Sequence, residues 1–131
     1  MTVTKAYHFH SAHRNIGGGE KCARLHGHTY HVECDFFFAE QNEHGVTMLF
    51  ADIDKVAEPI VKQYDHYTVL YSQDPLCEIF DNIGMEYKTL NTPTSAECFA
   101  VALFDEMALH LPISAIRLRE TTSSTVCYKG A

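Results

Sequence analysis

The sequence predicts an α+β fold with an antiparallel sheet, and three patterns carry this prediction. Residues 29–39 alternate between apolar and polar side chains, as a half-buried strand does. Residues 52–64 repeat apolar side chains at the spacing of an amphipathic helix. Strand-like segments flank the helical ones, without internal repeats, so hairpins separated by helices are expected.

The N-terminal part is expected to consist of strands. Residues 3–10 mix β-branched and aromatic side chains and predict a strand, and residues 14–21, with three consecutive glycines, predict a mobile loop. The strand over residues 29–39 is predicted to turn through residues 40–45 into a return strand over residues 46–50, forming a hairpin. One face of the longer strand carries Tyr30, Val32, Cys34, Phe36 and Phe38.

The first helix is expected to begin near Asp52. Pro59 lies within it, removes one backbone hydrogen bond, and predicts a kink or a split. Residues 72–93 form a weakly patterned connection, in which a short helix or strand is expected around residues 76–88.

A second helix is predicted to begin at Thr94, because Thr94 and Glu97 fit the N-cap and N3 positions of a capping box. Pro112 ends this helix. Strands over residues 114–122 and 126–128 complete the predicted fold.

Composition predicts one domain over residues 1–131. Ten Lys and Arg against seventeen Asp and Glu give a formal net charge of −7, which argues against a nucleic-acid or anionic-membrane partner. No apolar run reaches the length of a membrane span, and the polar N-terminus does not resemble a signal peptide. Five cysteines without a CxxC pair argue against a disulfide framework and favour a cytoplasmic location.

Two histidines predict a metal site. If the strand over residues 29–39 begins a little earlier, His26, His28 and Tyr30 share one face, so both imidazoles can reach one ion. A catalytic zinc site needs a third protein ligand. His8, His10, His13 and Cys22 are the candidates.

The residues alone leave the role of Cys22 open. As a ligand it would need a tight turn before His26, whereas a free thiol beside a metal and Lys21 would act as a base or nucleophile. Glu120 shares a face with Ile116 and Leu118, so its carboxylate is expected either at an exposed sheet edge or bound to donors.

Five motifs together resemble the 6-pyruvoyltetrahydropterin synthase family, and within it the bacterial 6-carboxytetrahydropterin synthases of queuosine biosynthesis. The resemblance covers nearly the whole chain. The motifs are Phe9-His10-Ser11-Ala12-His13, Cys22-Ala23-Arg24-Leu25-His26-Gly27-His28, Asp65-His66, Pro93-Thr94-Ser95-Ala96-Glu97 and Glu120-Thr121.

The resemblance implies the family's fold and assembly. The family has the tunnelling fold, an antiparallel four-stranded sheet with two helices on one face. Its trimers close into an oligomeric barrel and pair into homohexamers, with active sites between subunits. The Asp65-His66 pair is therefore expected to serve a neighbouring chain's Cys22.

The resemblance also implies the site residues. His13, His26 and His28 match the three zinc ligands, and Cys22 matches a catalytic cysteine that does not bind the zinc. Asp65 and His66 match a proton-relaying pair. Glu120 matches the carboxylate that anchors the pterin and is also part of the relay. The residues that match the lining of the pterin pocket are Thr94, Ser95 and Glu97.

The implied activity is the zinc-dependent conversion of 7,8-dihydroneopterin triphosphate to 6-carboxy-5,6,7,8-tetrahydropterin, acetaldehyde and triphosphate. Two alternatives stand beside this lyase: the sister reaction to 6-pyruvoyltetrahydropterin, and a non-catalytic zinc-binding module. Arg24, Lys21 and Arg14 are expected to contact the triphosphate. The chain departs from the family at the first helix, where Leu49-Phe50 stands in place of a common Asp-Phe pair.

Overall fold

Two twelve-residue strands form the centre of the sheet in the computed structural model, which describes residues 1–131. β1 (Thr2–His13) and β2 (His26–Phe37) are antiparallel and paired over their full length, from Thr2 opposite Phe37 to His13 opposite His26. The chain between them contains the short 3₁₀ helix η1 (Ile16–Gly18). The predicted strand over residues 29–39 is therefore confirmed, but its partner is the N-terminal strand.

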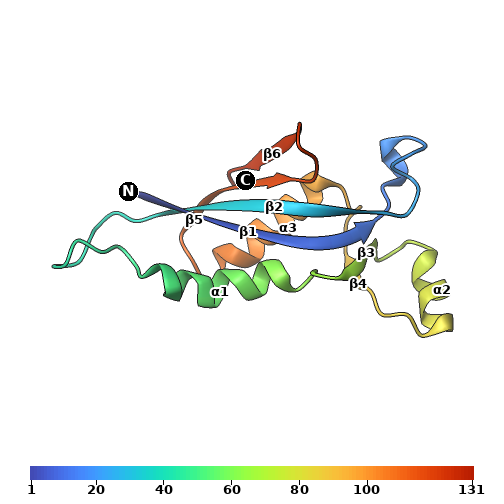
Figure 1. The fold of residues 1–131 in the computed structure, drawn as a ribbon, viewed down its shortest axis with the longest axis horizontal. Coiled ribbons are helices and arrows are strands. Elements are labelled where there is room, and N and C mark those ends of the chain that lie inside the picture. Colours follow the sequence, from blue (N-terminus) through green and yellow to red (C-terminus); the bar gives the residue numbers. More distant parts are fainter.

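Four further strands extend this pair into a curled, mixed six-stranded sheet in the order β4-β3-β1-β2-β5-β6 (Figure 1). On one side, β5 (Ile113–Arg119) pairs antiparallel with β2, and β6 (Thr125–Tyr128) pairs antiparallel with β5. On the other side, β3 (Tyr67–Tyr71) pairs parallel with β1, and β4 (Lys88–Leu90) pairs parallel with β3. The α+β class is confirmed, whereas the expectation of a four-stranded antiparallel sheet is wrong. Helical crossovers bring β3 and β4 in as parallel neighbours.

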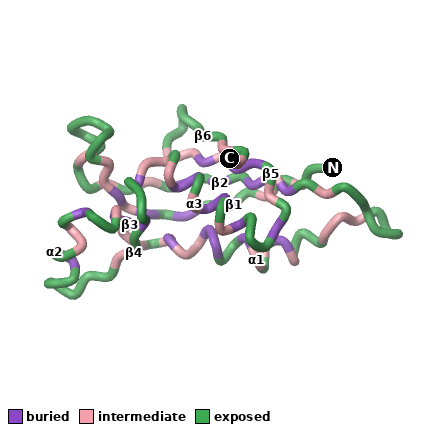
Figure 2. The backbone as a smooth tube through the Cα atoms, turned by 180° about the vertical axis from the view of Figure 1, so that it is seen from behind, coloured by how far each residue is buried: buried purple, intermediate pink, exposed green.

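Two helices cover one face of the sheet. α1 (Phe50–Lys62) packs against β1 and against α3 (Ala96–Ala108), and α3 also packs against β5 and β6. α2 (Leu76–Ile83) lies beyond the sheet, beside β3 and β4 (Figure 1). Figure 2 shows buried positions along the sheet and on α1 and α3. None of the helices has the length and apolar character of a membrane span.

The core lies between the sheet and these two helices. The alternation predicted for β2 is confirmed, because Tyr30, Val32, Cys34 and Phe36 are fully buried and their neighbours are not. Phe99 on α3 packs against the rings of the sheet. Because side chains alternate along a strand, the opposite face of β1 and β2 is polar and exposed.

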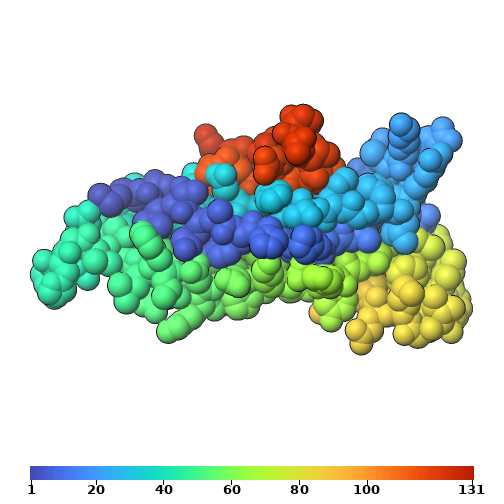
Figure 3. All heavy atoms as spheres, in the orientation of Figure 1, coloured from blue at the N-terminus to red at the C-terminus, as the bar shows by residue number.

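The predicted return strand over residues 46–50 is wrong. α1 already begins at Phe50, slightly before the predicted start, and Asn42 holds a turn by accepting the amide hydrogens of His44 and Val46. Residues 38–49 project from one end of the molecule, where no strand is available to pair with them (Figure 3).

Pro59 does not split α1, which continues to Lys62. Pro59 and Lys55 both lie on the exposed side of the helix, so water can reach the Lys55 carbonyl that lacks an intrahelical donor.

The predicted capping box at Thr94 is also wrong. Ser95 is the N-cap residue of α3, and its hydroxyl oxygen accepts a hydrogen bond from the Cys98 amide at 3.2 Å. The Thr94 hydroxyl instead donates to the Arg14 carbonyl at 3.0 Å. Glu97 is therefore one position too early to close a capping box.

Candidate metal centre and active site

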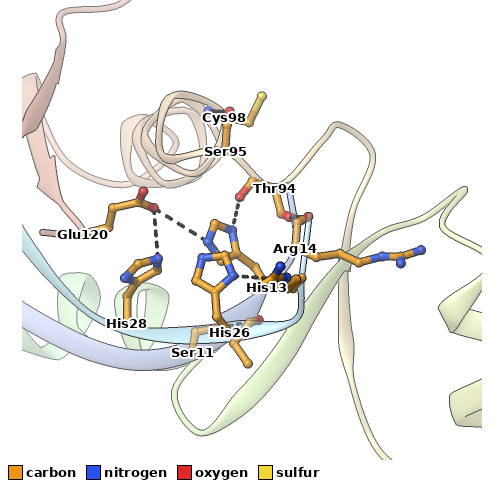
Figure 4. A network of polar contacts seen from close by, with 11 residues as sticks. Ser11, His13, Arg14, His26, His28, Thr94, Ser95, Cys98 and Glu120 are labelled. Atoms are coloured by element: carbon orange, nitrogen blue, oxygen red, sulfur yellow. Dashed lines mark hydrogen bonds and ion pairs between the residues drawn. The ribbon is translucent and has the colours of Figure 1, made fainter. Parts of the chain in front are cut away.

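Three imidazoles meet where β1 ends and β2 begins. His13 on β1 is paired with His26 on β2, and His28 is two residues further along the same face. Their ligand nitrogens all lie within 4.8 Å of one another, and the rings point into one space beneath the start of α3 (Figure 4). The sheet register therefore brings the two predicted histidines together with His13. His8 and His10 lie on strand positions that face the other side of the sheet.

Backbone carbonyls orient two of these rings. The Nδ1 atom of His13 donates to the Thr94 carbonyl at 2.5 Å, and the Nδ1 atom of His26 donates to the Arg24 carbonyl at 2.6 Å. These bonds leave each Nε2 with a free lone pair, which is the arrangement that a metal-binding histidine requires. Burial lowers the pKa of His13 and keeps its ring in the neutral form that binds metals.

Two of the ring nitrogens are buried and unpartnered. The Nε2 atoms of His13 and His28 have no hydrogen-bond partner, although neither is in contact with solvent. A buried polar atom without a partner is costly, and a bound cation removes that cost. Three neutral imidazoles within reach of one ion fit the ligand preference of zinc. These residues therefore fit a metal centre.

Glu120 lies beside the histidines. It follows the last residue of β5 and points toward the side of the sheet on which Ile116 and Leu118 are buried, as the alternation predicted. Its Oε2 atom is 3.8 Å from Nε2 of His13 and 3.9 Å from Nε2 of His28. That oxygen is also buried without a hydrogen-bond partner.

Thr94 lies next to the centre, whereas Glu97 does not contact it. Thr94 is 1% exposed and contacts two consecutive residues of the chain, through its hydroxyl to Arg14 and through its carbonyl to His13. Ser95 caps α3 above the histidines (Figure 4). Glu97 is exposed and lines a separate groove together with Asp105.

Cys22 is exposed on the loop of residues 14–25, which connects β1 to β2 and projects from one end of the molecule (Figure 3). Its backbone carbonyl accepts a hydrogen bond from the Asn15 amide at 2.7 Å. A Cβ atom on Gly18 would lie 2.8 Å from the Cβ of Cys22, so the glycine allows the loop to fold tightly on itself. Cys22 is not one of the residues whose ligand atoms cluster around the metal position.

Arg24 and Arg14, both expected to contact the triphosphate, differ in whether their charge is already paired within the fold. Arg24 is exposed, and its guanidinium lies 3.4 Å from the Glu20 carboxylate. The Arg14 guanidinium instead donates two hydrogen bonds, of 2.8 Å and 2.6 Å, to the buried Asp74. This pair lowers the pKa of Asp74 and engages the charge of Arg14 within the fold. The sequence pattern missed Asp74, although an Asp-Pro pair is a signal for a helix start, here that of α2.

The Asp65-His66 pair lies at the other face of the sheet. Asp65 accepts hydrogen bonds from the His10 amide and from Nδ1 of His66, each at 2.8 Å. The hydrogen bond from the His10 amide is the main reason that the pKa of Asp65 lies below its usual range, and the hydrogen bond from His66 lowers it further. The His66 and His10 rings are 5.6 Å apart, and His10 is on the exposed face. Within one chain, the sheet therefore separates this pair from the histidine cluster.

His66 has an unusual backbone. Its φ angle of 65° makes it the only residue other than glycine with a positive φ. Its amide donates to the His10 carbonyl at 2.7 Å, which holds this conformation against an intrinsic cost of about 1–3 kcal/mol.

Comparisons with known sequences agree on one family. The profile of the 6-pyruvoyl tetrahydropterin synthase family matches residues 2–131. The chain is 30% identical over 110 residues to the 6-carboxy-5,6,7,8-tetrahydropterin synthase of Rickettsia bellii, covering 82% of this chain and 80% of the relative. It is 25% identical over 139 residues to the protein of that name in Haemophilus influenzae, covering 97% of both. An Archaeoglobus fulgidus relative is 35% identical over 73 residues, which span 56% of this chain and 61% of the relative.

Solved structures share the fold. An uncharacterized protein from Wolinella succinogenes superposes with a TM-score of 0.82 at 17% identity, covering 100% of this chain and 98% of that one. The 6-pyruvoyl tetrahydropterin synthase of Caenorhabditis elegans superposes with a TM-score of 0.75 at 19% identity, covering 100% and 96%. With the family profile spanning almost every residue, the chain belongs to the 6-pyruvoyl tetrahydropterin synthase family.

Proposed function

We propose that the chain is a zinc-dependent 6-carboxytetrahydropterin synthase, a carbon–carbon lyase of queuosine biosynthesis. It would convert 7,8-dihydroneopterin triphosphate and one water to 6-carboxy-5,6,7,8-tetrahydropterin, acetaldehyde and triphosphate. The convergence of three imidazoles, two with buried and unpartnered Nε2 atoms, carries the proposal. The names of the Rickettsia bellii and Haemophilus influenzae relatives support this product.

His13, His26 and His28 would hold the metal. The oriented imidazoles favour Zn²⁺, which when bound would supply Lewis-acid chemistry to the hydroxyl groups of the substrate side chain. The carbonyls of Thr94 and Arg24 keep two of these rings in the tautomer and orientation that the metal requires.

Cys22 would act as the base that removes a proton from the side-chain carbon next to the pterin ring. Its exposure on the projecting loop leaves the thiol accessible to a substrate. Asp65 would orient His66 through Nδ1, so that Nε2 of His66 is free to take up or release a proton during cleavage.

The opposite placement of these two groups supports an oligomer. Because the Asp65-His66 pair lies across the sheet from the histidine cluster, a complete site would combine this pair with Cys22 of a neighbouring chain. We therefore propose the tunnelling-fold barrel, with residues 1–131 as one domain and a homohexamer as a dimer of trimers. A cytoplasmic location is consistent with five free cysteines.

Glu120 would accept hydrogen bonds from the guanidine-like edge of the pterin and take part in the proton relay, because its carboxylate suits paired donors. Thr94, Ser95 and Glu97 would line the pterin pocket, and the exposed Arg24 would contact the triphosphate. For Glu97 the support is weaker, since its carboxylate lines a separate groove.

The second candidate is the sister reaction, in which the same site forms 6-pyruvoyltetrahydropterin. The name of the matching family profile and that of the Caenorhabditis elegans neighbour favour it. A third reading, a non-catalytic zinc-binding module, would use the same histidines without Cys22.

Product analysis separates these candidates. Zinc-loaded protein is incubated with 7,8-dihydroneopterin triphosphate, and the pterin products are identified by mass spectrometry. We expect 6-carboxy-5,6,7,8-tetrahydropterin. A 6-pyruvoyl product would establish the sister reaction, and no product from a folded, zinc-loaded protein would favour the non-catalytic module.

A further inference from the structure

Three buried ligand-type atoms lack hydrogen-bond partners at one place: Nε2 of His13, Nε2 of His28 and Oε2 of Glu120. The carboxylate oxygen lies 3.8 Å and 3.9 Å from the two nitrogens, and Figure 4 shows it facing the His28 and His13 rings from one side. These separations are too long for hydrogen bonds, which require about 2.7–3.2 Å. The Glu120 carboxylate therefore approaches the histidines without bonding to either of them.

The separations suit two ligands of one metal ion. Bonds of about 2.05 Å to zinc place neighbouring ligands of a tetrahedron about 3.4 Å apart. Relative to His13 and His28, the Glu120 oxygen thus needs to move by only a few tenths of an ångström to meet that geometry. It lies outside the group of ligand atoms that the three histidines form, so the shift must also bring it toward His26. Such a shift is accessible because Glu120 follows the last paired residue of β5 and its side chain is 27% exposed.

We propose that Glu120 is the fourth protein ligand of the metal in the substrate-free protein, and that the substrate must displace it. The inference rests on the metal site of the proposed function. Three imidazoles and a carboxylate complete the coordination of a tetrahedral zinc, and such a closed site leaves no position for substrate hydroxyls.

The displacement links two roles of one carboxylate. While Glu120 binds the metal, its oxygen is not available to the pterin; once substrate hydroxyls replace it, the carboxylate is free to accept hydrogen bonds from the pterin edge. Substrate binding therefore opens the metal and anchors the ring with the same movement. In the absence of substrate, the closed site keeps water away from the metal.

Co²⁺ substitution tests the ligand set, because the visible absorption of this ion reports its coordination. The comparison uses wild type, Glu120→Gln and Glu120→Ala, with Glu43→Gln as the matched control, since Glu43 is exposed on a distant loop. We expect both Glu120 variants to change the Co²⁺ spectrum and to bind Zn²⁺ at least about tenfold more weakly. Acetate should restore the spectrum of Glu120→Ala. Glu43→Gln should match wild type.

Displacement is tested on the wild-type protein. Adding 7,8-dihydroneopterin, which keeps the two adjacent side-chain hydroxyls of the substrate and carries a third hydroxyl in place of the triphosphate, should change the Co²⁺ spectrum. Should Glu120→Gln not fold, Glu120→Asp tests the same contact in another way, because it keeps the charge but shortens the side chain by one methylene and so withdraws the carboxylate from the metal position.

The outcomes separate this inference from the proposed function. Unchanged spectra and Zn²⁺ affinities in the Glu120 variants would overturn it, even if wild type binds zinc and forms the pterin product. An altered variant spectrum without any response to 7,8-dihydroneopterin would leave Glu120 as a permanent ligand and overturn the displacement. Failure of wild type to bind either metal would overturn the inference and the proposed function together.

Discussion

Replacing Thr94 with valine tests how the fold supports the metal centre. Valine has nearly the same shape as threonine, so the change removes only the hydroxyl that donates to the Arg14 carbonyl at 3.0 Å. Losing this partly buried hydrogen bond costs about 0.5–1.5 kcal/mol of unfolding free energy. The same residue holds the His13 ring through its carbonyl, so a shift of Thr94 also disturbs a metal ligand.

The effect on the metal is separable from the effect on the fold. Loosening a hydrogen bond that orients a ligand lowers metal affinity about 10–100-fold. When the free zinc concentration exceeds the zinc dissociation constants of wild type and of Thr94→Val, the weaker binding removes about 1.4–2.8 kcal/mol of the stabilisation that bound zinc supplies. Thr94→Val should therefore destabilise the zinc-loaded protein by this amount more than it destabilises the zinc-free protein.

The assay is urea unfolding of wild type and of Thr94→Val, each with and without zinc. Competition with a chelator gives the zinc affinity of each protein. Thr92→Val is the matched control, because Thr92 is exposed two residues away. An equal destabilisation of Thr94→Val with and without zinc would refute the argument, since Thr94 would then contribute to folding alone.

Other perturbations test the catalytic thiol, the pH dependence and the core. Cys22→Ala should fold and retain zinc but lose at least about 100-fold in turnover, as loss of a catalytic base does; near-normal product formation would contradict its role. Arg117 holds the pKa of Asp35 below its usual value, so this pair's stabilisation is present above about pH 4 and is lost as the pH falls through the folded-state pKa. Acid unfolding of Asp35→Asn should accordingly depend less steeply on pH than that of wild type, and an unchanged slope would count against the pair. Phe99→Ala removes a fully buried ring and should cost about 3–5 kcal/mol by urea unfolding, whereas Val101→Ala on the exposed side of α3 should cost less than about 1 kcal/mol; similar losses would contradict the assigned core.

Local patterns predicted the parts of the fold that depend on one buried face. The alternation from Tyr30 to Phe36 identified β2 and its core face, because one side of this strand packs on helices and the other does not. The apolar repeat around Ile53 identified α1 for the same reason. The pairing of His26 with His28 followed from the strand period, which put both imidazoles on the core side.

Features that depend on distant partners could not be predicted in this way. β3 and β4 are five and three residues long, and their parallel pairing depends on neighbours elsewhere in the chain. Thr94 is not the helix cap because an acceptor 80 positions earlier in the chain takes its hydroxyl hydrogen bond. The resemblance implied that the Asp65-His66 pair serves a neighbouring chain, but the face of the sheet on which the pair lies became visible only from the contact of His66 with His10, on the exposed face of β1.

Acetaldehyde release tests the central claim most directly. Metal-free protein and protein reloaded with one zinc ion per chain are given 7,8-dihydroneopterin triphosphate, and acetaldehyde is measured against substrate consumed. The account predicts one acetaldehyde per substrate from the reloaded protein and none from the metal-free protein. Substrate consumption without acetaldehyde, or equal release with and without zinc, would contradict a zinc-dependent carbon–carbon cleavage.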